Sequence, residues 1–184
     1  MIKEAGSIIK YAVYLGMAVW LASMICWPGP ALADQGTENN SPVVLSDAFL
    51  YYADIKNGHL KAVARQFDPG LDAHKLGRTV LEALLEDPPA QGLLRVFPED
   101  TRVNALFITE SGNAFLDLSF SRQRLEPTDT MTEYLSIYSL VNTLAVNIPD
   151  IKQVKILLNG EEGASLGGHI SLEPFFKTNM LIVK

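Results

Sequence analysis

The sequence predicts an α+β domain in which two helices cover one face of a mostly antiparallel sheet. Two segments place apolar residues at helical spacing, and five segments have the residue types and alternation of strands. Their order along the chain is β-β-α-β-β-α-β. Because amphipathic helices bury their apolar stripes against a sheet, this order favours a single two-layer domain.

The first two strands are predicted at residues 43–53 and 60–67. Asn57-Gly58 lies between them and tolerates the positive φ angles that a tight hairpin turn requires. Asp68-Pro69-Gly70 then ends the second strand.

A helix is predicted next, because apolar residues recur every three or four positions along one stripe. Asp72 stands directly before the stripe, where its carboxylate can accept hydrogen bonds from the first turn. Pro88-Pro89 stops the helix. The stripe consists of Ala73, Leu76, Gly77, Val80, Leu81, Leu84 and Leu85.

A second hairpin is predicted from residues 103–109 and 114–120, which flank Ser111-Gly112. The second of these strands alternates in character, with Leu116 and its neighbours two positions away on an apolar face. Asp117 lies on the opposite face. Such alternation is typical of a sheet with one side packed on helices.

The second helix is predicted to start with a capping box at Thr130-Met131-Thr132-Glu133 and to end at Pro149. Its apolar stripe consists of Met131, Tyr134, Leu135, Tyr138, Val141 and Ala145. Asn142 lies near the edge of this stripe and is interpreted as a buried amide that hydrogen-bonds to backbone. A last regular strand is expected around residues 154–158.

A glycine-rich segment follows this strand, and it contains the residues that most resemble a site. Asn159-Gly160 predicts a tight turn, and Glu161 with Glu162 are expected to be exposed charges beside it. Gly167-Gly168 precedes His169, and the paired glycines are expected mainly to close the fold. Contact with a partner is the alternative role for these residues.

An enzyme is the rival interpretation of this segment. Residues 163–167 read GASLG and therefore fit the GxSxG pattern of a serine nucleophile, with Ser165 at its centre and His169 nearby. That pattern functions only where a strand turns into a helix, and Pro174 argues against a helix here. Glu161 and Glu162 would be the carboxylates of such a hydrolase or ligand-binding enzyme.

Other chemistries find little support in the sequence. No lysine and hydroxyl follow the last glycine, as a phosphate-binding loop requires. The three histidines are far apart in the sequence, so no metal site is expected. The net charge of −6 argues against binding to nucleic acid. We therefore expect no catalytic residues, cofactor or metal.

The first 33 residues are interpreted as a signal peptide. A basic start is followed by a nearly unbroken apolar run at residues 11–27, and Ala31-Leu32-Ala33 fits a signal peptidase site. As a helix the run spans about 26 Å, slightly less than the roughly 30 Å core of a bilayer. Cleavage after Ala33 is therefore favoured over an uncleaved N-terminal anchor, which would keep the protein at the membrane.

The rest of the chain is expected to be a flexible linker at residues 34–42 and one domain at residues 43–184. Cys26 follows Ile25, a poor fit to a lipoprotein signal, so lipidation is not expected. Cleavage after Ala33 would leave no cysteine, and hence no disulfide, thiol nucleophile or thiolate ligand.

Residues 49–173 resemble the GerMN domain, a sporulation and spore-germination module of bacterial envelope proteins. The matching pieces occur in the family's order with similar spacing. They are YYAD at 51–54, LLEDP at 84–88, FPEDT at 97–101, LDLS at 116–119, IYSLVNTL at 137–144, LNGEE at 158–162 and LGGH at 166–169.

The resemblance implies an exported, non-catalytic protein with a fold like the ring-building modules of envelope assemblies. Members are often tethered lipoproteins, and this chain departs from them in its poor lipoprotein signal. It also has one module where some relatives have two, which weakens the case for ring formation. No catalytic residues carry over.

The expected function is that of an envelope or periplasmic binding module in cell-wall remodelling or a process like sporulation or germination. Its expected partners are envelope proteins, peptidoglycan or further copies of itself. The residues singled out as a functional or structural motif are Asp117, Asn142, Asn159, Gly160, Glu161, Gly167, Gly168 and His169.

Overall fold

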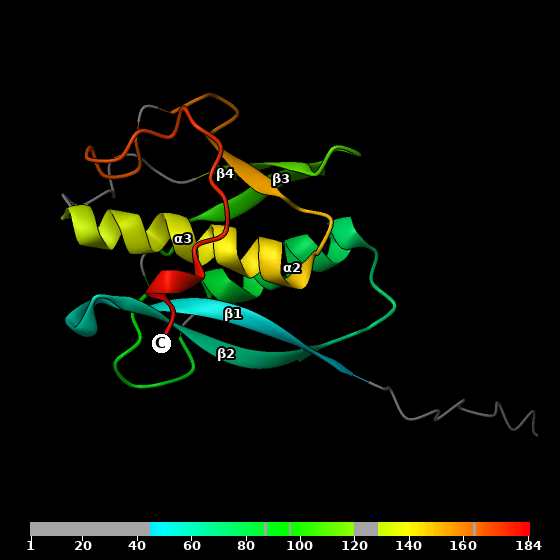
Figure 1. Cartoon of the computed structure of the whole chain (residues 1–184), viewed down its shortest axis with the longest axis horizontal. Coiled ribbons are helices and arrows are strands. Elements are labelled where there is room, and N and C mark those ends of the chain that lie inside the picture. Colours follow the sequence, from blue (N-terminus) through cyan, green and yellow to red (C-terminus); the bar gives the residue numbers. More distant parts are fainter. Residues whose placement is uncertain (1–44, 87, 96, 120–128, 164) are drawn as a thin grey trace, which may run out of the picture. The chain divides into compact units, whose positions relative to one another are not determined.

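A computed structural model describes residues 45–86, 88–95, 97–119, 129–163 and 165–184 (Figure 1). The predicted signal peptide and linker lie outside these residues. The α+β class and the order β-β-α-β-β-α-β are confirmed. The predicted single sheet with helices on one face is not found among the described residues. The strands are divided between two sheets, β1-β2 and β3-β4-β5, and the helices lie between them in Figure 1.

Strands β1 (Ser46–Asp54) and β2 (His59–Phe67) form the predicted antiparallel hairpin. A short 3-10 turn, η1 (Ile55–Asn57), connects them, and Gly58 has the positive φ of 68° expected from the Asn-Gly pair. The Asp54 carboxylate accepts from the backbone and the side chain of Asn57, at 3.2 and 3.0 Å for Oδ1. The turn is thus fixed by its own residues.

Helix α2 (Ala73–Leu85) begins where the sequence predicted, because the Asp72 carboxylate accepts from the Lys75 N–H at 2.9 Å. Its stripe packs into the core beside strand β3 and helix α3. Gly77 allows a close approach there, since a Cβ at this position would lie 2.5 Å from Leu106 Cδ2 and 2.8 Å from Ile148 Cδ1.

The second sheet contains β3 (Arg102–Ile108), β4 (Asn113–Ser119) and β5 (Gln153–Leu158), with β4 in the centre. The β3-β4 pair is antiparallel, with a register shift between Val103 and Ala105. The β4-β5 pair is parallel, because α3 carries the chain back across the domain before β5 starts.

Helix α3 (Thr130–Asn147) is the central element and is buried on most sides. The predicted capping box is wrong: Asp129 caps the helix, and its carboxylate accepts from the Thr132 N–H at 2.8 Å. Glu133 is buried and bonds elsewhere. Met131, predicted to be part of the buried stripe, is exposed. The fully buried apolar residues of this helix are Leu135, Ile137, Leu140, Val141 and Leu144.

The β1 edge that faces away from β2 is occupied by side chains of α3 rather than by another strand. The Asn147 amide accepts from the Phe49 N–H at 2.8 Å and donates to the Phe49 carbonyl at 2.7 Å. The Thr143 hydroxyl accepts from the Tyr51 N–H at 3.1 Å. These bonds explain why the hairpin does not join the other sheet.

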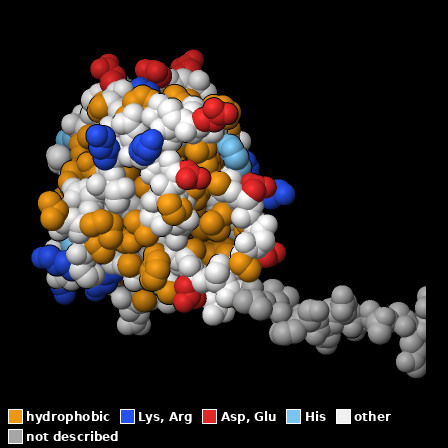
Figure 2. All heavy atoms as spheres, turned by 45° about the vertical axis from the view of Figure 1, so that its right-hand side comes forward, with side chains coloured by type: hydrophobic (Ala, Val, Ile, Leu, Met, Phe, Trp, Pro, Cys, Tyr) orange, Lys and Arg blue, Asp and Glu red, His pale blue; other side chains and the backbone are white. Residues whose placement is uncertain are grey.

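The surface carries both charged and apolar groups. Figure 2 shows one face on which hydrophobic side chains gather over the centre and lower part, while charged ones lie mostly at the top and rim. The exposed large apolar residues are Leu45, Phe49, Leu94, Phe107, Met131, Met180 and Leu181. Among the residues that the structure describes, no helix has the length and apolar character needed to cross a membrane.

Candidate functional site

The turn after β5 has the predicted conformation. Asn159 and Gly160 both have positive φ, 55° and 82°, and Leu158 and Glu161 exchange backbone hydrogen bonds across them. Asp117 belongs to this turn, because its Oδ1 accepts from the Gly160 N–H at 2.8 Å. Asp117 therefore ties β4 to the turn and has a structural role.

Glu161 and Glu162 are exposed, as expected. Glu162 Oε2 lies 3.2 Å from Nζ of Lys155, a buried lysine on β5. Lys155 Nζ also donates to the Glu173 carbonyl at 2.6 Å. Through Lys155, β5 thus contacts both the glycine-rich segment at Glu162 and the C-terminal segment at Glu173.

Glu133 holds the glycine-rich segment against α3. Its side chain is only 1% exposed, and its two carboxylate oxygens accept from the N–H groups of Gly167 and His169, each at 2.8 Å. The His169 Nδ1 lies 3.2 Å from Glu133 Oε2. Burial raises the pKa of Glu133, but hydrogen bonds from Gly167, His169 and Ile170 outweigh it, so this pKa is lowered overall.

The capping-box pattern led to the wrong prediction for Glu133, which bonds to the glycine-rich segment instead of its own helix terminus. In sequence, Thr-x-x-Glu before an apolar run predicts a glutamate that turns back to its own helix terminus. Here the helix starts one residue earlier, and Glu133 points toward a segment more than thirty residues away. The structure thus brings Gly167 and His169 together with Glu133, which the sequence analysis assigned only to the helix cap.

The GASLG motif lacks the geometry of a nucleophile elbow. Ser165 Oγ accepts from the Gly168 N–H at 2.8 Å, and Gly168 has a positive φ of 95°. His169 faces Glu133, and no hydrogen bond joins it to Ser165 in the described part of the chain. Bends rather than a helix follow Gly167. The segment is a loop stabilised by the Ser165 hydroxyl and by Glu133 of α3.

Asn142 is the predicted buried amide. Its Nδ2 donates to the Asn179 carbonyl at 2.9 Å, and its Oδ1 accepts from the Asn179 N–H at 2.9 Å. The Asn179 side chain in turn donates to the Tyr134 hydroxyl at 2.8 Å. Asn142 therefore fastens the C-terminal segment to α3.

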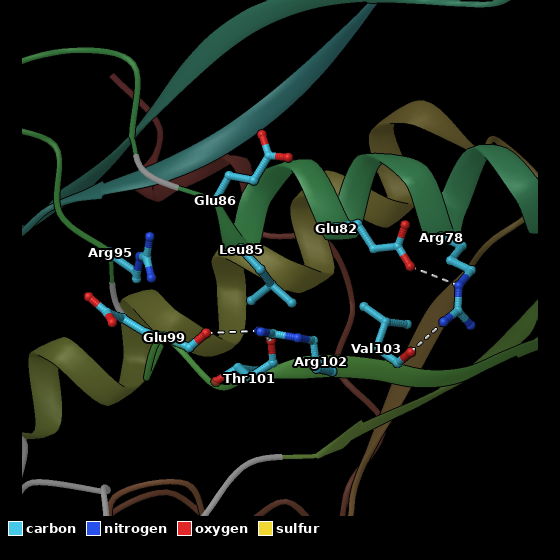
Figure 3. A pocket seen from close by; sticks show the side chains of 9 residues that line it. All are labelled: Arg78, Glu82, Leu85, Glu86, Arg95, Glu99, Thr101, Arg102 and Val103. Carbon is cyan, nitrogen blue, oxygen red and sulfur yellow. Dashed lines mark hydrogen bonds and ion pairs between the residues drawn. The ribbon is translucent and has the colours of Figure 1, made fainter.

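A cleft of about 390 Å³ lies between the C-terminal half of α2 and the segment that leads into β3 (Figure 3). Apolar side chains of Leu85 and Val103 lie within it, and charged groups of both signs surround them. The lining residues are Arg78, Glu82, Leu85, Glu86, Arg95, Glu99, Thr101, Arg102 and Val103.

Two guanidinium groups of the cleft are fixed by the backbone around β3. Arg78 donates to the Val103 carbonyl at 2.8 Å and pairs through Nε with Glu82 Oε1 at 2.8 Å. Arg102 Nη1 donates to the carbonyls of Glu99 and Thr101, both at 2.8 Å. Figure 3 shows these contacts on opposite sides of the cleft. Such bonds hold charged groups in place before any ligand arrives.

Thr101 is an unusual member of the lining. It is only 2% exposed, and its hydroxyl has no hydrogen-bond partner among the described residues. A buried hydroxyl without a partner costs free energy, so such a group requires an explanation.

Sequence reasoning did not identify this cleft as a site. Its residues come from one helix face, a loop and the start of β3, and their spacing forms no chemical motif. A signal was present, however. Two of the pieces that resemble GerMN domains, LLEDP at 84–88 and FPEDT at 97–101, supply Glu86 and Thr101 to the same cleft. No group of three or more acidic, histidine or cysteine side chains arranged for a metal occurs among the described residues.

The comparisons with known proteins identify the family. The model of the family described as "Germane: Sporulation and spore germination" matches residues 49–164. The chain belongs to this family. The resemblance to GerMN domains is therefore confirmed, and no curated protein matches the sequence.

Two solved bacterial structures are similar to this chain. The tandem GerMN domains of the sporulation protein GerM from Bacillus subtilis are 25% identical with a TM-score of 0.56, and the match covers 74% of this chain and 46% of that one. The chain thus spans about half of the tandem protein. A "putative lipoprotein" from Clostridium perfringens is 23% identical with a TM-score of 0.50, over 75% of this chain and 91% of that one.

Proposed function

We propose that this GerMN protein is an exported, non-catalytic binding module of the cell envelope, and that the cleft between α2 and β3 is its ligand site. The observation that carries the proposal is the set of fixed guanidinium groups around Leu85 and Val103. Binding sites commonly combine an apolar floor with a few polar groups held in position.

The charges of the cleft indicate the class of ligand. Arg102 suits a carboxylate, because a guanidinium offers several donors in one plane. Glu82, Glu86 and Glu99 suit ammonium groups. A peptide with free groups of both signs fits this mixture. Stem peptides of peptidoglycan and charged segments of envelope proteins are the envelope ligands with that chemistry.

Two further observations support the non-catalytic, exported role. The Ser165 hydroxyl bonds to the Gly168 N–H, and the His169 ring contacts Glu133 on α3. The two side chains therefore do not contact each other as a nucleophile and its base would. The N-terminal sequence predicts export, and one relative of the same fold is described as a "putative lipoprotein".

The test is co-sedimentation of the mature protein with purified peptidoglycan, together with in-cell crosslinking and mass spectrometry. Glu99→Lys reverses a charge of the cleft, and Glu110→Lys makes the same change at the distant tip of the β3-β4 hairpin. We expect Glu99→Lys to weaken capture of muropeptides or envelope proteins severalfold and Glu110→Lys to leave it unchanged.

Equal capture by both variants would place the ligand elsewhere and overturn the role of the cleft. Recovery of the protein with nothing crosslinked, together with substrate turnover that disappears in Ser165→Ala, would favour the rival hydrolase.

A further inference from the structure

The outer edge of β2 presents backbone groups that no other part of the described chain occupies. On β1, Phe49 and Tyr51 direct their N–H groups away from β2, toward α3. Their register partners on β2 are Ala64 and Ala62. In an antiparallel pair such partners both point away from the ladder, so Ala62 and Ala64 direct their N–H and C=O groups outward.

One end of this edge shows that every second residue of β2 directs its backbone groups outward. Leu60 is the next residue of the outward set, and its carbonyl accepts from the Lys184 N–H at 3.0 Å. Beyond it, the backbone groups of Ala62 and Ala64 make no hydrogen bond within the described residues, and both residues are exposed. The C-terminus thus covers only one end of the edge.

The rest of the described chain meets the other strand edges at individual positions. The Asn147 and Thr143 side chains bond to β1, and Arg78 bonds to the Val103 carbonyl of β3. On β5, Val154 exchanges two backbone hydrogen bonds with Phe176, both at 2.8 Å. An uncovered edge is a ready template for a further strand.

A second hollow lies directly beside this open edge. It has a volume of about 310 Å³ and is lined by Leu50, Tyr52, Val63, Ala64, Arg65, Glu86 and Pro89. Leu50, Tyr52 and Val63 make much of it apolar. Because Val63 and Ala64 belong to β2 itself, a strand added to this edge could place one side chain in the hollow.

The charges beside the hollow indicate which side chains an added strand should carry. Lys61 and Arg65 lie two residues on either side of Val63 on the same face of β2. Lys61 pairs with Asp54 at 2.8 Å and Arg65 with Glu86 at 2.9 Å, and roughly half of each cation's side chain remains exposed. A strand with carboxylates two positions before and after its apolar residue would complement both cations.

We propose that β2 binds an extended segment of a partner protein by strand addition, with an apolar residue in the hollow and acidic residues two positions away on each side. Backbone hydrogen bonds to Ala62 and Ala64 supply affinity, and the hollow supplies specificity. Antiparallel pairing of two copies about Val63 would place Lys61 of one copy beside Arg65 of the other, which is unfavourable for like charges.

The test uses the full mature protein and a displayed library of linear peptides of about ten residues, the upper length of ordinary strands. We expect enriched peptides to alternate acid, any residue, apolar, any residue, acid. Ala64→Pro removes an outward N–H from an edge strand, whereas Ala64→Ser keeps it. The proline variant should weaken binding at least about tenfold and the serine variant should not.

Amide hydrogen exchange of the wild-type complex provides a readout that does not depend on how Ala64→Pro folds. Peptide binding should slow exchange at Ala62 and Ala64, while Val63 and Arg65, already paired with β1, should change little. The proposal would be overturned if amide protection did not alternate along β2, or if no acid-apolar-acid peptides were enriched. Concentration-dependent dimerisation of the protein through β2 would also overturn it. Glu99→Lys should leave peptide binding to β2 intact. Failure of the cleft proposal can therefore be distinguished from failure of strand addition.

Discussion

Replacement of Glu133 by glutamine tests the contact that positions the glycine-rich segment. The wild-type carboxylate accepts from the N–H groups of Gly167 and His169 at 2.8 Å while only 1% exposed. A glutamine has one acceptor oxygen, so its amide group must face one of these donors. One buried N–H then loses its partner, and the other bond changes from charged to neutral.

The expected loss can be estimated from these two changes. A hydrogen bond to a charged group contributes about 1.5–3 kcal/mol and a neutral one about 0.5–1.5 kcal/mol, while a buried donor without a partner costs about 1–3 kcal/mol. Together they predict that Glu133→Gln lowers the free energy of unfolding by about 2–5 kcal/mol. Glu161→Gln, which changes an exposed glutamate, should cost less than about 0.5 kcal/mol.

The assay is urea denaturation of the mature protein at several pH values. The pKa of Glu133 in the folded state is below its unfolded value, so the unfolded chain binds more protons and stability rises with pH. The contribution is fully present above the unfolded pKa of about 4.3 and is lost as pH falls through the lowered folded pKa. Glu133→Gln should lack this component of acid sensitivity.

A variant within about 0.5 kcal/mol of wild type at neutral pH would refute the reasoning, because it would mean that the carboxylate bonds contribute almost nothing. An unchanged acid dependence would refute the assignment of the lowered pKa to Glu133.

Other consequences of the structure are directly measurable. Lys61→Met should raise the pKa of Asp54 from about 2 toward its ordinary value, because the side-chain hydrogen bond from Lys61 is the main cause of the lowered pKa; NMR titration of the carboxyl carbon would show it. Gly112→Ala should lower the free energy of unfolding by more than about 2 kcal/mol, because a Cβ would lie 2.6 Å from the Asp150 carbonyl at a φ of 91°. Gly92→Ala has a similar φ of 87° but open space around it, so thermal unfolding should show a smaller loss. Ser165→Ala should alter ligand capture only in proportion to any fall in melting temperature, and a selective loss of function in a fully stable variant would contradict a purely structural role.

Local signals in the sequence were reliable where neighbouring residues alone fix the conformation. Asp72 caps α2 because the carboxylate and the free N–H groups lie within one turn. Asn159-Gly160 forms its turn because both residues tolerate positive φ. Asn142 was also interpreted correctly, since a buried amide must find backbone partners.

Local patterns did not predict correctly how α3 is capped. Thr130 and Glu133 fit the capping-box pattern, but Asp129 caps the helix instead. Glu133 accepts hydrogen bonds from the glycine-rich loop. The cap by Asp129 is local, whereas the position of Glu133 depends on a segment more than thirty residues away.

By itself, then, the sequence determined the family, the α+β class and the order and type of the elements, because periodicity and turn residues act over a few positions. Only the tertiary structure decided that the strands form two sheets, that β5 runs parallel to β4, and that α2, Arg95 and residues 99–103 line a charged cleft. It also decided that β2 keeps an open edge. The physical reason is that pairing, edge coverage and cleft formation depend on which distant groups satisfy one another's hydrogen bonds and charges.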